Sequence, residues 1–434
     1  MGQKTKAHFT NGKSSEQSLR VDADNLKTHL AENPRCPHGP TLLFHRTLQK
    51  TGLQKSFYSC AAFRDKKRCK FHLECSPGVQ KTGKRKVQEI TERTEADRVD
   101  GDLGAPSRKS QKKSGAASKF EYDASLLPKD WCGHCQKLVP FERTAGHPHH
   151  LEKVDTRFPT RFLPAMEDNP AEAQYFFSER TKEFFIHFLQ SQKAKNVICV
   201  GCPRLHEEIL ASSTSTSGLC SFLLDIDARF STFFPRKSFA HYNMFNHYFF
   251  EPADRRAYLN FIREKEPDDV IIVMDPPFAG IVQVLANSLQ CIFADIGGQC
   301  SLLWIFPYYM EKHISREAPY LRMISYKVEY ANHGKMRDKS ALTRGSPIRI
   351  FTNIQPELIQ LPAQEGYWFC QPCRKFSSRE ERHCPQCGEC AGKDGKVWRH
   401  CRKCKRCVKG DWQHCQRCQR CHDKVCINAT SSGT

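Results

Sequence analysis

Short apolar runs alternate with polar and helix-like stretches between residues 155 and 360. Seven runs stand out: 196–200, 221–227, 239–245, 270–275, 301–307, 324–330 and 348–353. Runs of this length predict strands, and helix-like stretches between most of the early ones predict an α/β sheet. Residues 172–190 have the apolar spacing of a helix packed on that sheet. The loop 331–346 is too short for a crossover helix, so the last two strands should form an antiparallel edge.

Polar and cysteine-rich segments surround this α/β region, which we place at 156–362. Residues 1–33 and 427–434 have the composition of polar tails, and 76–125 that of a flexible linker or insertion. Three Cys/His-rich segments remain, and they predict small modules flanking the α/β domain. These modules span 34–75, 126–155 and 366–426.

The composition of the chain indicates which kinds of molecule it can bind. The 434 residues are 39% hydrophobic, which is enough for packed cores. The chain has 67 Lys+Arg against 47 Asp+Glu, a net charge of +20 that favours polyanions, nucleic acid first. No apolar run approaches the ~18 residues of a membrane span, and the N-terminus lacks the apolar stretch of a secretory signal. We therefore expect no membrane partner and reduced cysteines.

Reduced cysteines interspersed with histidines predict zinc sites, because thiolates and neutral imidazoles complete a tetrahedral shell. The second cluster should be a structural finger on the α/β domain, since Pro140 and Gly146 interrupt the short stretch between its ligand pairs. His149 is a competing ligand there. The expected ligands are Cys36, His38, Cys60 and Cys69 in the first cluster and Cys132, Cys135, His147 and His150 in the second.

The third cluster has the most specific spacing, a triple repeat of His-Cys-x-x-Cys-x-x-Cys after an opening Cys-x-x-Cys. Twelve of the 23 cysteines lie between 370 and 426. Together with His383, His400, His414 and His422 they suffice for four sites, although three are equally compatible, so the chain should bind about five or six zinc ions. Interleaved Lys and Arg favour RNA backbone contact, with protein interaction as the alternative. The expected ligands are Cys370, Cys373, His383, Cys384, Cys387, Cys390, His400, Cys401, Cys404, Cys407, His414, Cys415, Cys418 and Cys421.

Two segments of the α/β region could form a ligand site. The first predicted strand runs into a turn at Gly201 and Cys202, and ligands of open α/β sheets bind outside the carboxyl ends of strands. The missing G-x-G-x-x-G argues against a dinucleotide, whereas S-adenosylmethionine carries no phosphate. The second strand ends in Asp225-Ile226-Asp227, where a carboxylate could hold a ribose diol. An ordinary βα turn is the alternative.

The second segment is Asp275-Pro276-Pro277-Phe278, directly after a fully apolar strand. Two prolines cannot continue a central strand, so the backbone must leave the sheet at the strand's carboxyl end. The Asp275 carboxylate and the Pro276 carbonyl could accept both N–H bonds of a planar amine while Phe278 stacks on the base. These groups would orient an amine for methylation without a metal. A proline turn without chemistry is the alternative.

The sequence DPPF resembles the [DN]PP[FYW] motif of class I amino-group methyltransferases, which act on adenine, cytosine or protein amines. The resemblance implies a Rossmann-like, S-adenosylmethionine-dependent domain with a seven-stranded sheet. It assigns catalytic positions to Asp275, Pro276, Pro277 and Phe278. It implies cofactor positions at Gln174, Tyr175, Phe177, Val200, Gly201, Cys202, Asp225, Asp227, Asn243 and Asp275.

The first cluster, with FYSCAAFRDKKRCKF, resembles a GRF-type finger that binds nucleic acid, with Lys55, Phe57 and Tyr58 on its expected RNA surface. A purely structural zinc site is the alternative. The four modules together resemble a family of zinc-finger rRNA N6-adenosine methyltransferases. The resemblance implies an adenosine of large-subunit (28S-type) rRNA as substrate and a nucleolar or nuclear location. It also implies RNA-processing or helicase partners of the cysteine-rich region. A protein lysine methyltransferase and a non-catalytic zinc-rich RNA-binding adaptor are the alternatives.

Overall fold

The computed structural model describes residues 17–48, 54–63, 65–75, 129–166, 174–212, 218–332, 345–392 and 396–423. The expected C-terminal tail, the linker at 76–125, Cys426 and residues 1–16 of the expected N-terminal tail lie outside the described residues. Residues 17–33 of that expected tail form a strand and two helical turns of the first finger instead.

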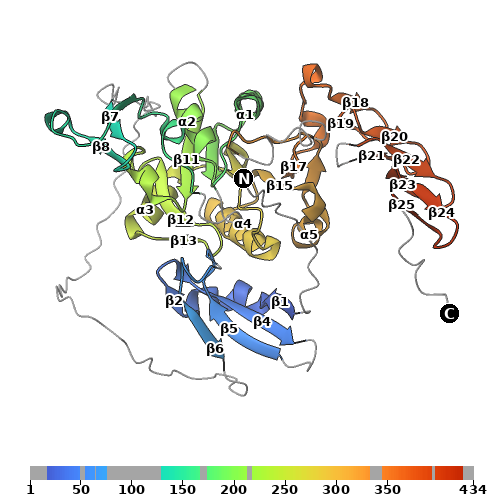
Figure 1. Ribbon diagram of the computed structural model, residues 1–434, viewed down its shortest axis with the longest axis horizontal. Coiled ribbons are helices and arrows are strands. Elements are labelled where there is room, and N and C mark those ends of the chain that lie inside the picture. The colour runs from blue at the N-terminus through green and yellow to red at the C-terminus, as the bar shows by residue number, and fades with distance from the viewer. Residues whose placement is uncertain are drawn as a thin grey trace, which may run out of the picture.

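An eight-stranded mixed sheet forms the centre of the molecule (Figure 1), in the order β13-β12-β11-β10-β14-β15-β17-β16. The five strands from β12 to β15 are parallel, and β13, β17 and β16 each pair antiparallel with a neighbour. The predicted antiparallel edge is confirmed. The strands are β10 (Asn196–Val200), β11 (Cys220–Asp225), β12 (Phe239–Asn243), β13 (Tyr248–Phe249), β14 (Val270–Met274), β15 (Ser301–Pro307), β16 (Arg322–Ile324) and β17 (Ile348–Thr352).

Two details of the prediction are corrected. The sheet has eight strands rather than seven, because the chain turns back after β12 and adds the two-residue β13. The predicted helix at 172–190 begins only at Glu179, where the Ser178 side chain accepts from the N–H of Thr181 and caps the first turn. The preceding residues are extended, and Phe177 forms an isolated bridge with Tyr330.

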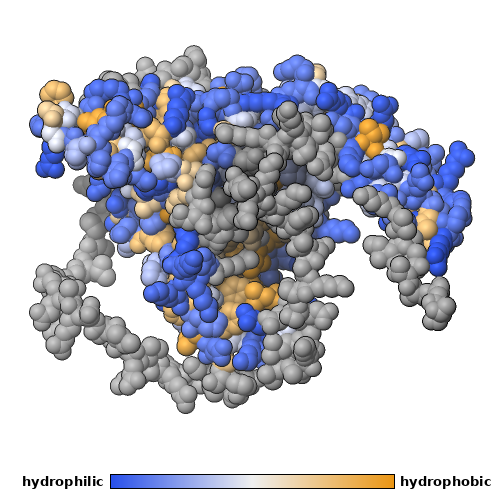
Figure 2. Space-filling view, viewed as in Figure 1, coloured by the Kyte–Doolittle hydropathy of each residue, from blue (hydrophilic) through white to orange (hydrophobic). Residues whose placement is uncertain are grey.

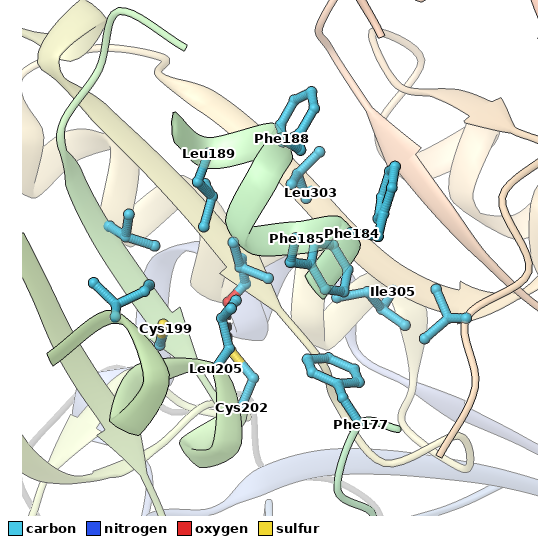
Figure 3. Close-up of a cluster of buried hydrophobic side chains, with 14 of the residues drawn as sticks. Phe177, Phe184, Phe185, Phe188, Leu189, Cys199, Cys202, Leu205, Leu303 and Ile305 are labelled. Atoms are coloured by element: carbon cyan, nitrogen blue, oxygen red, sulfur yellow. Dashed lines mark hydrogen bonds between the residues drawn. The ribbon is translucent and has the colours of Figure 1, made fainter. Parts of the chain in front are cut away.

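Helices cover both faces of the sheet, which is why β14 at its centre is apolar at every position. Side chains alternate between faces along a strand: Val197 and Cys199 of β10 pack with α1 and α2, whereas Ile198 and Val200 pack with α3, α4 and α5. Figure 3 shows the aromatic side chains of α1 beside Leu303 and Ile305 of β15. The helices are α1 (Glu179–Ser191), α2 (Pro203–Ser212), α3 (Pro252–Ile262), α4 (Val282–Ile296) and α5 (Glu311–Glu317).

Two small modules pack directly on this domain. The first finger (residues 17–75) has a sheet of order β1-β4-β5-β6 and lies, coloured blue in Figure 1, against α4 and β13. In the second finger (129–154), Trp131 is buried in the domain core against Phe162 and Phe233, as expected of a structural finger. The strands are β1 (Gln17–Val21), β2 (Arg35–Cys36), β3 (Gly39–Pro40), β4 (Leu42–Leu48), β5 (Gln54–Ser59), β6 (His72–Cys75), β7 (Lys129–Cys132), β8 (Lys137–Val139) and β9 (Glu152–Val154).

The C-terminal segment is a row of four β-hairpins, which we call the zinc ladder (residues 367–423). Its first part contacts the sheet domain: Glu381 accepts from Ser325 (2.8 Å) and Glu380 pairs with Lys327 (3.1 Å). On the face shown in Figure 2 the ladder surface is mostly hydrophilic. The strands are β18 (Trp368–Cys370), β19 (Lys375–Ser377), β20 (Arg382–Cys384), β21 (Glu389–Ala391), β22 (Trp398–Cys401), β23 (Arg406–Lys409), β24 (Gln413–Cys415) and β25 (Arg420–His422).

Short helical turns complete the described chain, and none of its helices combines the length and apolar character needed to cross a bilayer. A π-helical turn spans Asn25–His29. The 3-10 turns are Leu30–Glu32, Phe141–Arg143, Pro159–Arg161, Ala228–Thr232, Pro267–Asp269, Tyr308–Met310, Pro356–Leu358 and Ala363–Glu365.

Candidate active site

The carboxyl ends of three neighbouring strands meet beside Asp275. Its backbone N–H donates to the carbonyl of Val200 (3.0 Å), and the N–H of Gly201 donates to the carbonyl of Leu224 (2.9 Å). These bonds hold the ends of β14, β10 and β11 side by side. This edge of an open α/β sheet is where ligands bind.

Gly201 makes the turn at the end of β10. Its φ of +69° lies in the left-handed region that favours glycine. A Cβ there would come within 2.7 Å of the Cε of Met244 and 3.0 Å of the Asp275 carbonyl oxygen. Glycine at position 201 therefore lets the turn after β10 pack directly against Met244 and the backbone of Asp275.

Asp275 is held by a residue 55 positions away. The Tyr330 hydroxyl donates to Oδ1 of Asp275 at 2.7 Å, and Tyr330 is only 5% exposed. Burial raises the pKa of the Asp275 carboxyl well above its ordinary value, and the hydrogen bond from Tyr330 opposes that rise because it favours the carboxylate. One carboxylate oxygen is thus oriented by the protein.

Aromatic rings surround this carboxylate. Tyr175 stacks on Phe278 with ring centroids 5.7 Å apart, and Tyr330 lies 5.7 Å from Tyr175 and 5.9 Å from Phe278. Phe177 stacks behind Tyr330 at 5.5 Å. Planar bases stack on such rings, so the cluster offers an aromatic surface beside Asp275.

The extended segment at 174–178 brings Tyr175 to the site. The side chain of Asn332 accepts from the N–H of Phe176 and donates to the carbonyl of Gln174, both at 2.9 Å. The segment is thereby tied to the chain following Tyr330. The Gln174 amide also reaches Oδ2 of Asp227 at 3.4 Å.

The two carboxylates after β11 have different surroundings. Asp227 binds the Arg229 guanidinium through both oxygens, at 2.7–3.1 Å, so its charge is already balanced. Asp225 accepts from the N–H of Asp227 at 2.9 Å, and burial together with the Asp227 charge raises its pKa to about 7. Asp225 is therefore the better candidate for a ribose diol.

Several other predicted cofactor residues do not face this site directly. Asn243 is fully buried, donates to the His38 carbonyl of the first finger (2.8 Å) and accepts from the N–H of Phe245 (3.0 Å). Its side chain joins two modules, and its expected contact with the cofactor stays a prediction. Val200 and Cys202 are also buried, and the Cys202 thiol donates to the Val273 carbonyl (3.3 Å), so only their backbone can contribute.

The first finger gathers all four predicted zinc ligands, Cys36, His38, Cys60 and Cys69, with their ligand atoms within 4.8 Å of one another. The Nδ1 of His38 lies 3.9 Å from the Cys36 sulfur and 3.5 Å from the Cys60 sulfur. Tetrahedral zinc requires about 3.6 Å between nitrogen and sulfur ligands. The donor set and spacing fit zinc.

The first finger also corrects one expectation about its RNA surface. Phe57 is buried in the finger core against Phe44 and is not part of that surface.

In the second finger the structure selects His149 over the predicted His150. Cys132, Cys135, His147 and His149 converge, and the Nδ1 of His149 lies 3.5 Å from the Cys135 sulfur. Consecutive residues of this segment alternate in exposure, and His150 is on the exposed side. Alternation allows only one of the two adjacent imidazoles to face the cluster.

The zinc ladder pairs its ligands across repeats. Within one repeat, the His and the last Cys lie opposite each other in a hairpin and belong to the same site, as His383 and Cys390 do. The two cysteines of the Cys-x-x-Cys turn between them are ligands of the following site. The three interleaved sets are Cys370, Cys373, His383 and Cys390; Cys384, Cys387, His400 and Cys407; and Cys401, Cys404, His414 and Cys421. Beyond them, Cys415 forms side-chain contacts with Cys418 and His422.

One residue of the active site escaped prediction, Tyr330, whereas His149 was named only as a competing ligand. Tyr330 ends the last apolar run before the predicted edge loop, and an aromatic residue at that position was the signal available. Nothing in the sequence links it to Asp275 over 55 residues.

Comparison with known proteins agrees with this geometry. Residues 168–354 match the family described as "Probable N6-adenine methyltransferase". The human "rRNA N(6)-adenosine-methyltransferase ZCCHC4" is 36% identical over 378 residues, covering 82% of this chain and 70% of the human protein. The protein of that name from Mus musculus is 37% identical over 375 residues, with the same coverage, and that from Xenopus tropicalis is 34% identical over 366 residues, covering 81% and 73%. The chain therefore belongs to the ZCCHC4 family of rRNA N6-adenosine methyltransferases.

Proposed function

We propose that the chain methylates N6 of an adenosine in large-subunit (28S-type) ribosomal RNA. The proposal rests mainly on the Asp275 carboxylate at the end of β14, which Tyr330 orients beside the rings of Tyr175 and Phe278. S-adenosylmethionine, when bound along the strand ends from Gly201 to Asp225, supplies the methyl group.

The residues of the chain orient the base and stabilise its charge. The Asp275 carboxylate and the Pro276 carbonyl accept the two N–H bonds of the adenine amine, which directs its lone pair away from them. Tyr330 keeps the carboxylate in place, and the carboxylate stabilises the positive charge that develops on the nitrogen. Phe278 and Tyr175 hold the ring flat.

RNA binding is assigned to the zinc modules. An adenine in a helix cannot reach Asp275, so the target must be unpaired or flipped out, and separate modules must hold the flanking RNA. Exposed cations of the first finger (Lys55, Lys66) and of the ladder (Arg402, Lys405) suit phosphate contacts. Five zinc sites follow from the clusters described above, and Cys415, Cys418 and His422 would begin a sixth. The proposal includes a nucleolar or nuclear location and RNA-processing or helicase partners for the ladder.

The test is methylation of total RNA by the purified chain with labelled cofactor, resolved by RNA species and nucleoside. We expect label in N6-methyladenosine of the large-subunit RNA. Asp275→Ala should abolish transfer, a loss of at least ~1000-fold, because an orienting charged group at the reacting atom is removed. RNA affinity should be unchanged. Asp268→Ala, at an exposed carboxylate, is the matched control.

Each alternative predicts a different result. Label in protein would favour a lysine methyltransferase, since the same motif serves protein amines. Absence of cofactor binding by calorimetry would favour the non-catalytic adaptor. Wild-type turnover by Asp275→Ala would contradict the assignment of the site.

A further inference from the structure

A cavity of about 370 Å3 lies at the seam between the first finger and the sheet domain. We call it the seam cavity. Its finger wall includes His38, Phe63 and Arg68. Its domain wall includes Ile226, His241 and Phe250. Its volume falls within the range of small-ligand sites, and neither module forms it alone.

The seam is held by direct hydrogen bonds. The Asn243 and Asn246 amides both donate to the His38 carbonyl, at 2.8 and 3.1 Å, and Asn246 donates also to the Pro40 carbonyl at 2.8 Å. A Cβ on Gly39 would lie only 2.5 Å from the Tyr248 ring. The finger turn therefore sits directly on the ends of β12 and β13, and the cavity is a fixed feature of the fold.

The strand order places this cavity on the path of the cofactor. The methyl group must reach Asp275 after β14, and the ribose is expected at Asp225 after β11. The adenine and the sulfonium leave the ribose in opposite directions, so the adenine must point away from β14. The next strand on that side is β12. Ile226 follows Asp225 directly, and His241 belongs to β12.

The walls suit a flat, neutral ring. The His241 and Phe250 rings stack on the domain side, with centroids 3.7 Å apart and planes 9° apart. His241 is held there by a bond from its Nε2 to the Ile226 carbonyl (3.1 Å). On the finger side, the Arg68 guanidinium lies 4.1 Å from the centroid of the Phe63 ring. Both surfaces can stack on a purine.

We propose that the first finger forms one wall of the adenine site of the cofactor, with Phe63 and Arg68 as binding residues. The inference rests on the proposed function, because it requires an adenosyl cofactor. The zinc finger then has a second task beside RNA: it completes the methyl-donor pocket.

The test is calorimetric titration of the full chain with S-adenosylhomocysteine, which reports binding without turnover. Phe63→Ala should raise Kd about tenfold or more, given that base–aromatic stacking contributes ~1–3 kcal/mol. Arg68→Ala should raise it about threefold to tenfold. Lys27→Ala, an exposed cation of the same finger, should leave Kd unchanged. Zinc content and RNA affinity are measured for every variant.

Arg68→Ala keeps the test decisive if Phe63→Ala loses the finger zinc. Wild-type Kd values for both variants would overturn the inference and leave the proposed function intact. Loss of RNA affinity at unchanged S-adenosylhomocysteine affinity would also overturn it, because the cavity would then serve RNA. No binding by the wild-type chain would refute the proposed function itself.

Discussion

The sheet domain and the zinc ladder are stabilised in opposite ways. Strands β10 and β14 are buried on both faces between two layers of helices, and apolar side chains fill both sides. In the described ladder beyond residue 381, the buried apolar side chains other than cysteine are Ala391 and Val408. Hairpins with strands of three or four residues cannot bury enough surface to be stable alone. The domain is held by burial, and the ladder by the ions its ligands would bind.

Zinc removal should have the largest effect of the tests below, because it should unfold the ladder and leave the sheet domain folded. Structural zinc contributes about 10–16 kcal/mol per site in small metal-folded modules. A strong chelator should therefore unfold residues 382–423 while the sheet domain keeps its fold. Limited proteolysis followed by mass spectrometry measures this. First cuts inside β10 or β14 would show that the sheet domain also depends on metal.

The pairing of ladder ligands can be tested with one substitution. Cys384→Ser should weaken the site shared with Cys387 and Cys407, so both thiols should become alkylatable in the otherwise native chain. Cys390 should stay protected, because it belongs to the preceding site. The matched control is Cys220→Ser, an exposed cysteine of the sheet domain. Protection of Cys407 with exposure of Cys390 would indicate sites formed within each repeat.

A core substitution should affect only the sheet domain. Ile272 is fully buried in β14, and Ile272→Ala should lower the free energy of unfolding by about 2–5 kcal/mol through lost burial and a cavity. Urea unfolding of the sheet domain measures the loss, while zinc content should not change. Leu358→Ala, at a position 63% exposed, should cost less than about 0.5 kcal/mol. Equal effects of the two would contradict the burial argument.

The smallest expected effect is a pH dependence of cofactor binding. The raised pKa of Asp225, about 7, means that its carboxyl is mostly protonated at pH 6 and mostly ionised at pH 8. A ribose diol donates best to the carboxylate. The Kd for S-adenosylhomocysteine should therefore be roughly tenfold higher at pH 6 than at pH 8. Calorimetry measures it, and Asp225→Asn should bind weakly with no such dependence. A flat wild-type profile would exclude Asp225 as the acceptor.

Much of the sheet domain was predictable because its signals are local. Strand positions follow from apolar runs, and the prolines after Asp275 place that carboxylate at a strand end. The two-residue β13 and the late start of α1 were not predictable in this way. β13 is too short to leave a pattern, and the residues before Glu179 form extended contacts with a segment about 150 positions away.

The sequence by itself determined the chemistry that is available: a carboxylate and a phenyl ring at a strand end, and thiolates and imidazoles in metal-binding spacing. Only the tertiary structure decided which of these groups meet. In the folded chain His149 and not His150 lies with the other ligands of the second finger, and the ladder sites combine ligands from neighbouring repeats. Tyr330 contacts Asp275, and the first finger contacts the end of β12. Residue type and spacing are properties of the local chain, whereas these contacts depend on how distant segments pack.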